Sequence, residues 1–426
     1  MSTTRNVLLE TGYTRHDSGA VSTQTALFTI HSEDGLITSL EQQAATTSVA
    51  AGEYDARGLL GIPPTKDLHI HLDKGHFGGP WQAVVPAPNG VPDRILEEQR
   101  FLPAFLEFLP ERAGALLEHI AAGGTTFMRV QVNVDPTIGL QNYEVVRDVL
   151  AAHAPRVQSE LVAFPQHGTL VTEAQGLLTQ AMEAGVPILG GLDPASIDGD
   201  IEGSLTTTFE LASRFDREVD IHLHDGGETG IHTIQRIIDY TREYGMAGRV
   251  AISHALALGF ASDEQLTRLA EGLAAQGVSI FTTQPLSYAS TFGARAVPWP
   301  ILKAAGVRVC MINDNINDHW SPFGSGDLIE RVSRAAEIWR QVDEIGLANA
   351  YTLVSDGVLP LNDAGEMLWP KTGDEATILL TNASCLSEVV ARVPKERVMM
   401  FRGEIDRLPA VARGNAGGTR SLRTQE

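Results

Sequence analysis

Two histidines, His69 and His71, stand one residue apart in the run Asp-Leu-His-Ile-His-Leu-Asp-Lys at residues 67–74. Side chains alternate along an extended chain with a period of two, so both imidazoles project from the same side. This spacing lets both rings reach one metal ion at the open end of a strand. Taken alone, the pair also fits structural or solvated histidines, so the other ligands must come from elsewhere in the chain.

Other polar residues that can bind a metal or transfer protons follow later apolar segments. They are Gln166, His167, His222, His224, Asp225, His254 and Asp314. Each has a structural interpretation when taken singly: a buried histidine, a helix-capping aspartate or a solvated glutamine. Scattered structural residues, however, have no reason to fall at the same end of successive strands. Whether these residues form one functional site therefore depends on the strands that precede them.

Eight apolar, β-branched segments predict strands at 68–72, 126–134, 159–164, 187–192, 218–222, 249–253, 278–282 and 307–312. Helical periodicity fills most of the intervals, at 110–122, 143–152, 203–215, 233–244, 263–276 and 298–305. This alternation implies parallel strands with right-handed crossovers, and eight units match a closed (β/α)8 TIM-type barrel. An open doubly wound sheet is the alternative, but no Gly-x-Gly-x-x-Gly opens a helix after the early strands. Barrels of this type carry their chemistry at the C-terminal strand ends, where the polar residues fall.

The two ends of the chain predict a second, smaller unit of this α/β protein. Short strands are expected at 6–9, 26–30, 36–40 and 58–62, and again at 376–380 and 398–402. We expect residues 1–62 and 358–411 to form one small β-sandwich subdomain, with the barrel at 63–357 inserted between its halves. Residues 412–426 are rich in Gly, Arg, Ser and Thr, which is typical of a flexible tail.

The overall composition limits the class of protein. A hydrophobic content of 43% and a charged content of 20% are those of an ordinary globular protein. The net charge of −21 argues against nucleic acid or an anionic membrane as a partner. Two cysteines, Cys310 and Cys385, cannot make a disulfide framework. The first residues are not followed by the apolar core of a signal peptide, and no apolar run approaches about 18 residues. We therefore expect a cytoplasmic protein with a small-molecule substrate.

Six segments together resemble the amidohydrolase superfamily, in the branch that holds cytosine deaminase and N-isopropylammelide isopropylaminohydrolase. They are DLHIHLDK at 67–74, VAFPQHG at 162–168, GGLDPA at 190–195, DIHLHD at 220–225, SHA at 253–255 and NDNINDHWSPFGSG at 313–326. They span nearly the whole barrel in family order. The aminohydrolase pattern is the nearer, because cytosine deaminase has a glutamate where Asp225 stands and no lysine at the position of Lys74.

The resemblance implies a single divalent metal ion, zinc or iron. Its ligands would be His69, His71, His222 and Asp314. Three neutral imidazoles and one carboxylate leave a position for water, as catalytic sites require. Many superfamily members hold two metals bridged by a carboxylated lysine on the fourth strand. No lysine stands between Lys74 and Lys303, so a mononuclear site is expected.

The resemblance also suggests catalytic roles for three residues. In this hypothesis a metal-activated water attacks an amidine-like carbon, and Asp314 accepts the water proton. His254 orients the water and stabilises the tetrahedral intermediate. Asp225 protonates a ring nitrogen and then the leaving amine, for which burial must raise its pKa.

Four residues are expected to contact the substrate. Gln166 offers a donor and an acceptor to the amide-like edge of a heterocycle, and Lys74 stabilises a ring carbonyl oxygen. Trp320 either stacks on the ring or packs at the barrel mouth. His224 points the same way as His222, as a substrate contact or a support. The loops 75–94 and 284–298 are expected to shape the pocket.

These expectations predict a metal-dependent hydrolase that deaminates or dealkylaminates a cytosine-like pyrimidine or an aminotriazine. One alternative is a cyclic amide hydrolase, against which the missing bridging lysine counts. A second alternative is a catalytically dead barrel scaffold, which should show a broken ligand set. The expected partners are a small heterocyclic substrate and further copies of the chain in a homo-oligomer.

Overall fold

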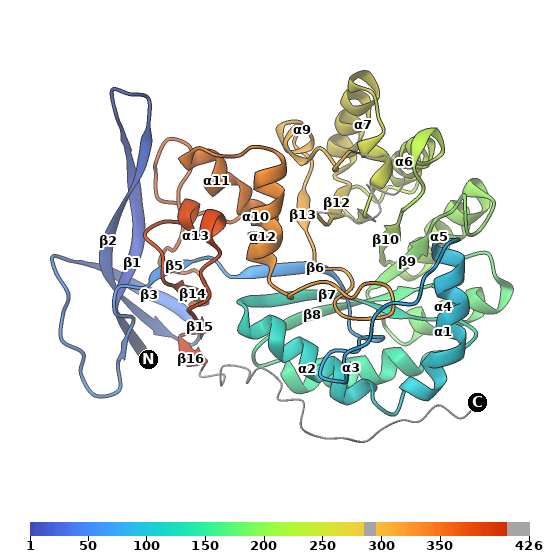
Figure 1. Ribbon diagram of the computed structural model, residues 1–426, viewed down its shortest axis with the longest axis horizontal. Coiled ribbons are helices and arrows are strands. Elements are labelled where there is room, and N and C mark those ends of the chain that lie inside the picture. Colours follow the sequence, from blue (N-terminus) through green and yellow to red (C-terminus); the bar gives the residue numbers. More distant parts are fainter. Residues whose placement is uncertain (285–294, 407–426) are drawn as a thin grey trace.

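The parallel sheet of the barrel dominates the computed structural model, which describes residues 1–284 and 295–406 (Figure 1). Its strands are β6 (Thr65–His71), β7 (Thr125–Asn133), β8 (Gln158–Phe164), β9 (Ile188–Leu192), β10 (Glu218–His222), β11 (Val250–Ser253), β12 (Ser279–Thr282) and β13 (Val309–Met311). Each pairs with the next along the chain, and a parallel bridge from Ile70 to Asp314 brings the last strand back to the first. The predicted TIM-type barrel is confirmed.

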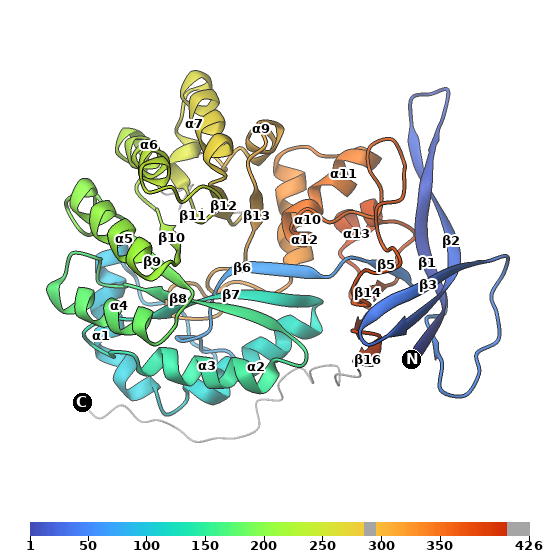
Figure 2. The same cartoon turned by 180° about the vertical axis from the view of Figure 1, so that it is seen from behind.

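Amphipathic helices cover the outside of this sheet (Figures 1 and 2). They are α2 (Leu109–Ala122), α3 (Gln141–His153), α4 (Thr172–Glu183), α5 (Ile201–Phe215), α6 (Gly227–Glu243), α7 (Asp263–Gln276), α9 (Trp299–Ala304) and α10 (Leu328–Ile338). In α6, Ile231, Ile234 and Ile238 recur at helical spacing and are buried. Ser262 and Gln265 form a capping box that starts α7. A short 3-10 turn (Leu256–Gly259) follows β11.

Helix α1 (Val91–Phe105) is absent from the predicted ranges. The expected loop at 75–94 ends earlier, because residues from Val91 onward form this helix. The residues that α1 buries are Arg94, Glu98 and Leu102, of which only Leu102 is apolar. A buried face made of charged residues gives no hydrophobic periodicity, which is why the sequence pattern missed this helix.

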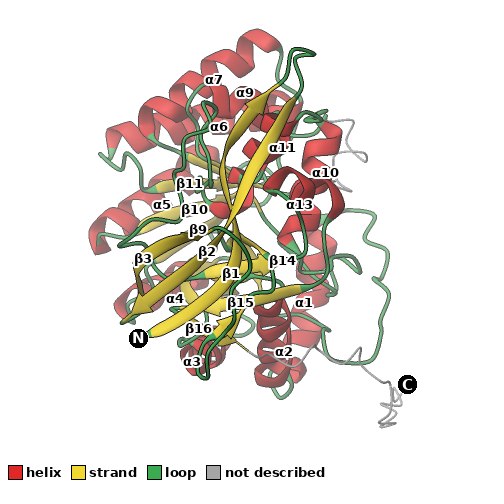
Figure 3. Ribbon diagram, turned by 90° about the vertical axis from the view of Figure 1, so that its left-hand side faces the viewer, coloured by secondary structure: helices red, strands yellow, loops and turns green. Residues whose placement is uncertain are grey.

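The chain ends meet in a second eight-stranded sheet (Figure 3). Its strands are β1 (Ser2–Arg15), β2 (Val21–Glu33), β3 (Leu36–Gln43), β4 (Tyr54–Asp55), β5 (Leu60–Ile62), β14 (Ile378–Thr381), β15 (Arg397–Phe401) and β16 (Glu404–Asp406). β14 runs antiparallel to β5 and places Leu379 opposite Ile62, so the C-terminal strands continue the N-terminal sheet. The β subdomain built from both ends is therefore present.

The remaining elements follow the barrel strands in sequence, and the last of them lies between β14 and β15. Helices α11 (Glu344–Ala350), α12 (Thr352–Ser355) and α13 (Leu386–Arg392) complete the described chain. The predicted loop 284–298 lies mostly outside the described residues, and the predicted tail 412–426 lies entirely outside them. Among the helices of 1–284 and 295–406, none is long and apolar enough to cross a membrane.

Candidate active site

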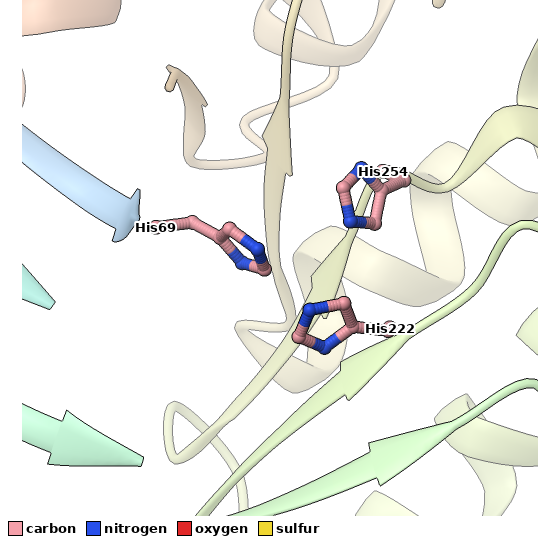
Figure 4. A group of neighbouring side chains, drawn as sticks. All are labelled: His69, His222 and His254. Carbon is pink, nitrogen blue, oxygen red and sulfur yellow. The ribbon is translucent and has the colours of Figure 1, made fainter. Parts of the chain in front are cut away.

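The predicted metal ligands converge at the C-terminal end of the barrel. Nε2 of His69 lies 3.4 Å from Oδ1 of Asp314, and Nε2 of His71 lies 3.6 Å from the same oxygen. Nε2 of His222 lies 3.4 Å from Nε2 of His71. His254 joins them, since its ring, like those of His69 and His222, faces a common space (Figure 4).

The donor set fits a divalent metal ion. Nε2 of His69 is buried and makes no hydrogen bond to the residues that the structure describes. Burial lowers the pKa of His71, His222 and His254 well below the ordinary value, which keeps these imidazoles neutral. Burial opposes the ionisation of Asp314, but His254 and His69 beside it hold its pKa below the usual range. Neutral imidazoles and an ionised carboxylate are the states in which these groups bind metal.

A hydrogen-bonded chain behind His69 fixes its tautomer. Oγ of Ser253 donates to Oδ1 of Asp220 at 2.6 Å and lies 2.7 Å from Nδ1 of His69. Arg129 donates to the other Asp220 oxygen at 3.3 Å. Because the serine proton goes to the carboxylate, Nδ1–H of His69 donates to the serine oxygen. The lone pair of His69 Nε2 then faces the space that this ring shares with the other candidate ligands.

Two site residues have unusual backbone conformations. His254 directly follows β11, and Asp314 stands three residues after the end of β13. Their φ values are +68° and +62°. Side chains other than glycine adopt this left-handed region rarely, and such residues cluster at functional sites. The amide of Asp314 donates to the carbonyl of His69 at 3.0 Å, so the turn that aims its carboxylate also helps to close the barrel.

A second polar group lies beside the histidines. Nζ of Lys74 donates to Oε1 of Gln166 at 2.9 Å and to Oε1 of Glu98 at 3.1 Å. Trp320 donates its indole N–H to the same Glu98 oxygen at 2.7 Å. The ring of Phe164 connects the two groups, because it stacks on His222 at 4.0 Å and lies 5.6 Å from Nζ of Lys74.

Gln166 retains an unused donor. Its Nε2 is buried and has no hydrogen-bond partner in the described part of the chain. A buried donor in this state costs free energy unless a ligand or water satisfies it. The orientation of Gln166 is fixed on its other side, because Oε1 accepts from Lys74. An amide held in this way is suited to donate to a carbonyl oxygen of a bound ring.

Asp193 organises the residues that follow β10. It accepts a hydrogen bond from Nδ1 of His224 at 2.8 Å and from the amide of Asp225 at 3.3 Å. The ring of His224 also stacks on His254 at 4.3 Å. Burial and the neighbouring charge of Asp193 raise the pKa of Asp225 above its ordinary value. This shift is in the direction that a proton-donating carboxyl group requires.

Comparison with known proteins identifies the family. The model of the amidohydrolase family matches residues 82–358. The chain belongs to this family. The predicted resemblance is thereby confirmed, and the chain is a hydrolase of the amidohydrolase superfamily.

Three relatives of this amidohydrolase show how similar it is to known proteins in sequence and structure. The uncharacterised protein YahJ of Escherichia coli K12 is 38% identical over 402 residues, 94% of this chain and 86% of the relative. The structure of N-isopropylammelide isopropylaminohydrolase from Burkholderia multivorans has a TM-score of 0.80 and 29% identity, with 95% of this chain and 98% of that chain covered. The structure of 5-methylcytosine deaminase from Klebsiella pneumoniae has a TM-score of 0.77 and 25% identity, with 95% of this chain and 97% of that chain covered.

The amidohydrolase chain supplies several supporting residues that the sequence did not single out. They are Glu98, Asp193, Asp220, Ser253 and His319. Asp220 had a usable signal, since it stands two residues before His222 and so projects from the same face of β10. Gln131 donates to Asp220 at 3.3 Å, and Asn133 donates to Glu98 at 2.6 Å. These two residues on β7 thus also support the site.

Two other polar residues near the strand ends have structural partners. His167 lies 3.7 Å from Asp135. Asn315 donates to Asp318, whose other oxygen accepts the amides of Trp320 and Ser321 at 2.8 and 2.9 Å. Asp318 therefore fixes the turn that presents Trp320, and Asn315 fixes Asp318.

Proposed function

We propose that this amidohydrolase uses one zinc or iron ion to deaminate or dealkylaminate an N-heterocycle, either a cytosine-like pyrimidine or an aminotriazine. The single observation that carries the proposal is the convergence of His69, His71, His222 and Asp314 with His254 beside them. The ligand set is unbroken, which supports an enzyme over an inactive scaffold. A bound divalent ion would activate a water molecule as the nucleophile.

The residues of the chain divide the proton transfers between them. Asp314, held ionised, is the acceptor for the proton that the attacking water loses. His254 is neutral, and its buried Nε2 makes no hydrogen bond within 1–284 and 295–406, so it is available to the oxygen of the tetrahedral intermediate. Asp225 gives its proton to the ring nitrogen and then takes up the hydroxyl proton of the tetrahedral intermediate. It delivers this second proton to the leaving amine as the carbon–nitrogen bond breaks and the carbonyl group forms.

The polar group beside the histidines binds the ring in this proposal. Gln166 donates Nε2–H to a ring carbonyl oxygen, and Lys74 places its positive charge beside the same edge. Trp320 presents an aromatic face, which favours a flat ring. The names of two relatives, N-isopropylammelide isopropylaminohydrolase and 5-methylcytosine deaminase, specify rings of this class.

A substrate screen tests the proposal. Protein loaded with zinc or with iron would be incubated with cytosine, methylcytosines, isocytosine, ammelide and N-alkyl ammelides, and released ammonia or amine measured. We expect release from at least one of these rings, and none from the Asp314→Ala variant. If none of them yields ammonia or amine, the substrate lies outside this ring class and the proposal is wrong.

A further inference from the structure

Glu98 is the centre of the polar group beside the histidine cluster. It lies on α1, is fully buried, and comes from a segment that no sequence motif marks. Its Oε1 accepts from Lys74 at 3.1 Å, from Nε2 of His319 at 2.8 Å and from the indole of Trp320 at 2.7 Å. Its Oε2 accepts from Asn133 at 2.6 Å. Four donors therefore hold one carboxylate in a single orientation.

The same contacts hold Lys74 and Trp320 in place. Lys74 is only 1% exposed, and two of its three N–H groups are used by Glu98 and Gln166. Nζ of Lys74 lies 5.9 Å from the centre of the Trp320 ring. Because both side chains bind one oxygen of Glu98, the carboxylate sets the distance between the ammonium and the indole.

Glu98 also balances the charge of Lys74. A buried ammonium without a counter-ion would attract an anion into the site, since the energy of an unpaired buried charge is high. With Glu98 ionised, the hydrogen-bonded pair is neutral as a whole, and the buried carboxyl groups of Asp73 and Asp318 also favour the charged state of Lys74. A ring that binds beside it therefore needs a hydrogen-bond acceptor but no negative charge of its own.

We propose that Glu98 is a positioning residue that fixes Lys74 and Trp320 and balances the charge of Lys74. As a result, the site selects an uncharged ring with a carbonyl oxygen over an anionic ring. The inference rests on the proposed function in one respect, namely that Lys74 and Trp320 face the substrate. It adds the charge class of the substrate and the residue that determines it.

Glu98→Gln is the direct test, with Glu97→Gln as the matched control. Glu97 is the neighbour on α1 and pairs with Arg94 rather than with Lys74. The new amide group would face Nδ2 of Asn133, which now donates to Glu98. It is tolerable because the Asn133 amide can turn over, and its Oδ1, which makes no hydrogen bond to described residues, then accepts. Binding of uracil, uncharged near neutral pH, and of barbiturate, a ring of similar size that is anionic there, would be measured by calorimetry.

We expect Glu98→Gln to shift the ratio of uracil to barbiturate affinity at least tenfold toward barbiturate. The KM for an uncharged substrate should rise at least tenfold, while metal content and the Glu97→Gln control stay as in the wild type. A purely structural role would lower thermal stability and leave the affinity ratio unchanged. A ratio within twofold of the wild-type value, or a wild-type protein that binds neither ring, would overturn the inference.

A second set of variants covers the case in which Glu98→Gln does not fold. Lys74→Met should shift the ratio at least tenfold toward uracil, because Glu98 is then unpaired and repels the anion. The double variant Lys74→Met/Glu98→Gln removes both charges and should return the ratio to near the wild-type value. Failure of that return would refute the charge balance.

The affinity measurements test the role of Glu98 independently of the proposed reaction. If no ring releases an amine but the affinity ratio shifts as described, the reaction is wrong and the role of Glu98 stands. If amine is released and the ratio does not respond to Glu98→Gln, the role of Glu98 alone is wrong.

Discussion

Nδ1 of His69 lies 2.7 Å from Oγ of Ser253, on the side of the ring away from Asp314. Ser253 in turn donates to Asp220, so a buried carboxylate sets the proton position on a histidine at the centre of the site. Partners of this kind orient ligating imidazoles and increase their basicity. If His69 binds the metal as proposed, metal affinity is expected to depend on a serine that is not itself among the proposed ligands.

Ser253→Ala should therefore weaken metal binding by about 10- to 100-fold. The ring of His69 would lose its acceptor at Nδ1 and could rotate or change tautomer. Competition with a chelator of known affinity would measure the change. Ser279→Ala is the control, since Ser279 lies on the neighbouring strand β12 and its hydroxyl contacts Arg308. Equal affinities for the two variants would contradict the role of Ser253.

Asp225→Asn should keep the metal and lose turnover by roughly 10²- to 10⁴-fold, the usual contribution of general acid–base catalysis. The amide has nearly the same shape but cannot donate a proton to a leaving amine. The measurement is kcat on a ring that the wild-type enzyme hydrolyses, together with the metal content of the same sample. Near-normal kcat with a full metal site would remove Asp225 from the reaction.

Arg129→Met should lower the free energy of unfolding by about 3–5 kcal/mol, the usual cost of leaving a buried charge unpaired. Arg129 pairs with Glu160, Glu218 and the fully buried Asp220. Urea denaturation of the metal-free protein would measure the loss.

Arg308→Met is the matched control for Arg129→Met. Both guanidinium groups lie over the Phe281 ring, at 5.3 and 5.7 Å from its centre, but the Arg308 side chain is 45% exposed and pairs with Asp356. Removing an exposed pair should cost less than about 1 kcal/mol. A loss for Arg129→Met no larger than for Arg308→Met would show that the buried network does not stabilise the barrel.

Glu10→Gln should stabilise the protein above neutral pH. Burial raises the pKa of Glu10 to about 7, although its carboxyl accepts the amide of Leu386. Between the unfolded pKa near 4.5 and about 7, the folded state binds more protons than the unfolded state, so stability falls as pH rises. The ionised carboxyl would then cost roughly 3 kcal/mol above pH 7.

Urea denaturation at pH 5 and pH 8 tests the assignment to Glu10. The difference in stability between the two pH values should become smaller in Glu10→Gln. The exposed Glu264 of α7, which pairs with Arg268, provides a control in Glu264→Gln. If Glu10→Gln and the wild type show the same difference between pH 5 and pH 8, Glu10 does not titrate in this range.

The sequence predicted the barrel and the residues at its rim for a physical reason. Buried parallel strands are continuous apolar segments, and residues at their ends point to one rim. His69, His71, His222 and Asp314 were therefore predictable as rim residues, whereas only the family resemblance selected these four as a ligand set. Their distances were not, because these depend on the closure between β6 and β13 and on the left-handed backbone of Asp314.

The surroundings of the site were less predictable. Glu98 lies on a helix whose buried face is mostly charged, so no apolar pattern marked it. The sequence predicted Lys74 as a substrate contact, and that role remains a proposal, but nothing local in the chain indicates that a carboxylate from α1 binds it. Partners of this kind are set by packing between distant segments, which periodicity does not encode.

The metal content of the purified protein tests the central claim most directly. We predict one zinc or iron ion per chain in the wild type and in Asp225→Asn, and less than about a tenth of that in Asp314→Ala, since loss of a ligand weakens the site. Elemental analysis of the three proteins purified in parallel gives the answer. No stoichiometric metal in the wild type, two ions per chain, or full retention in Asp314→Ala would contradict a single-metal site built on these four residues.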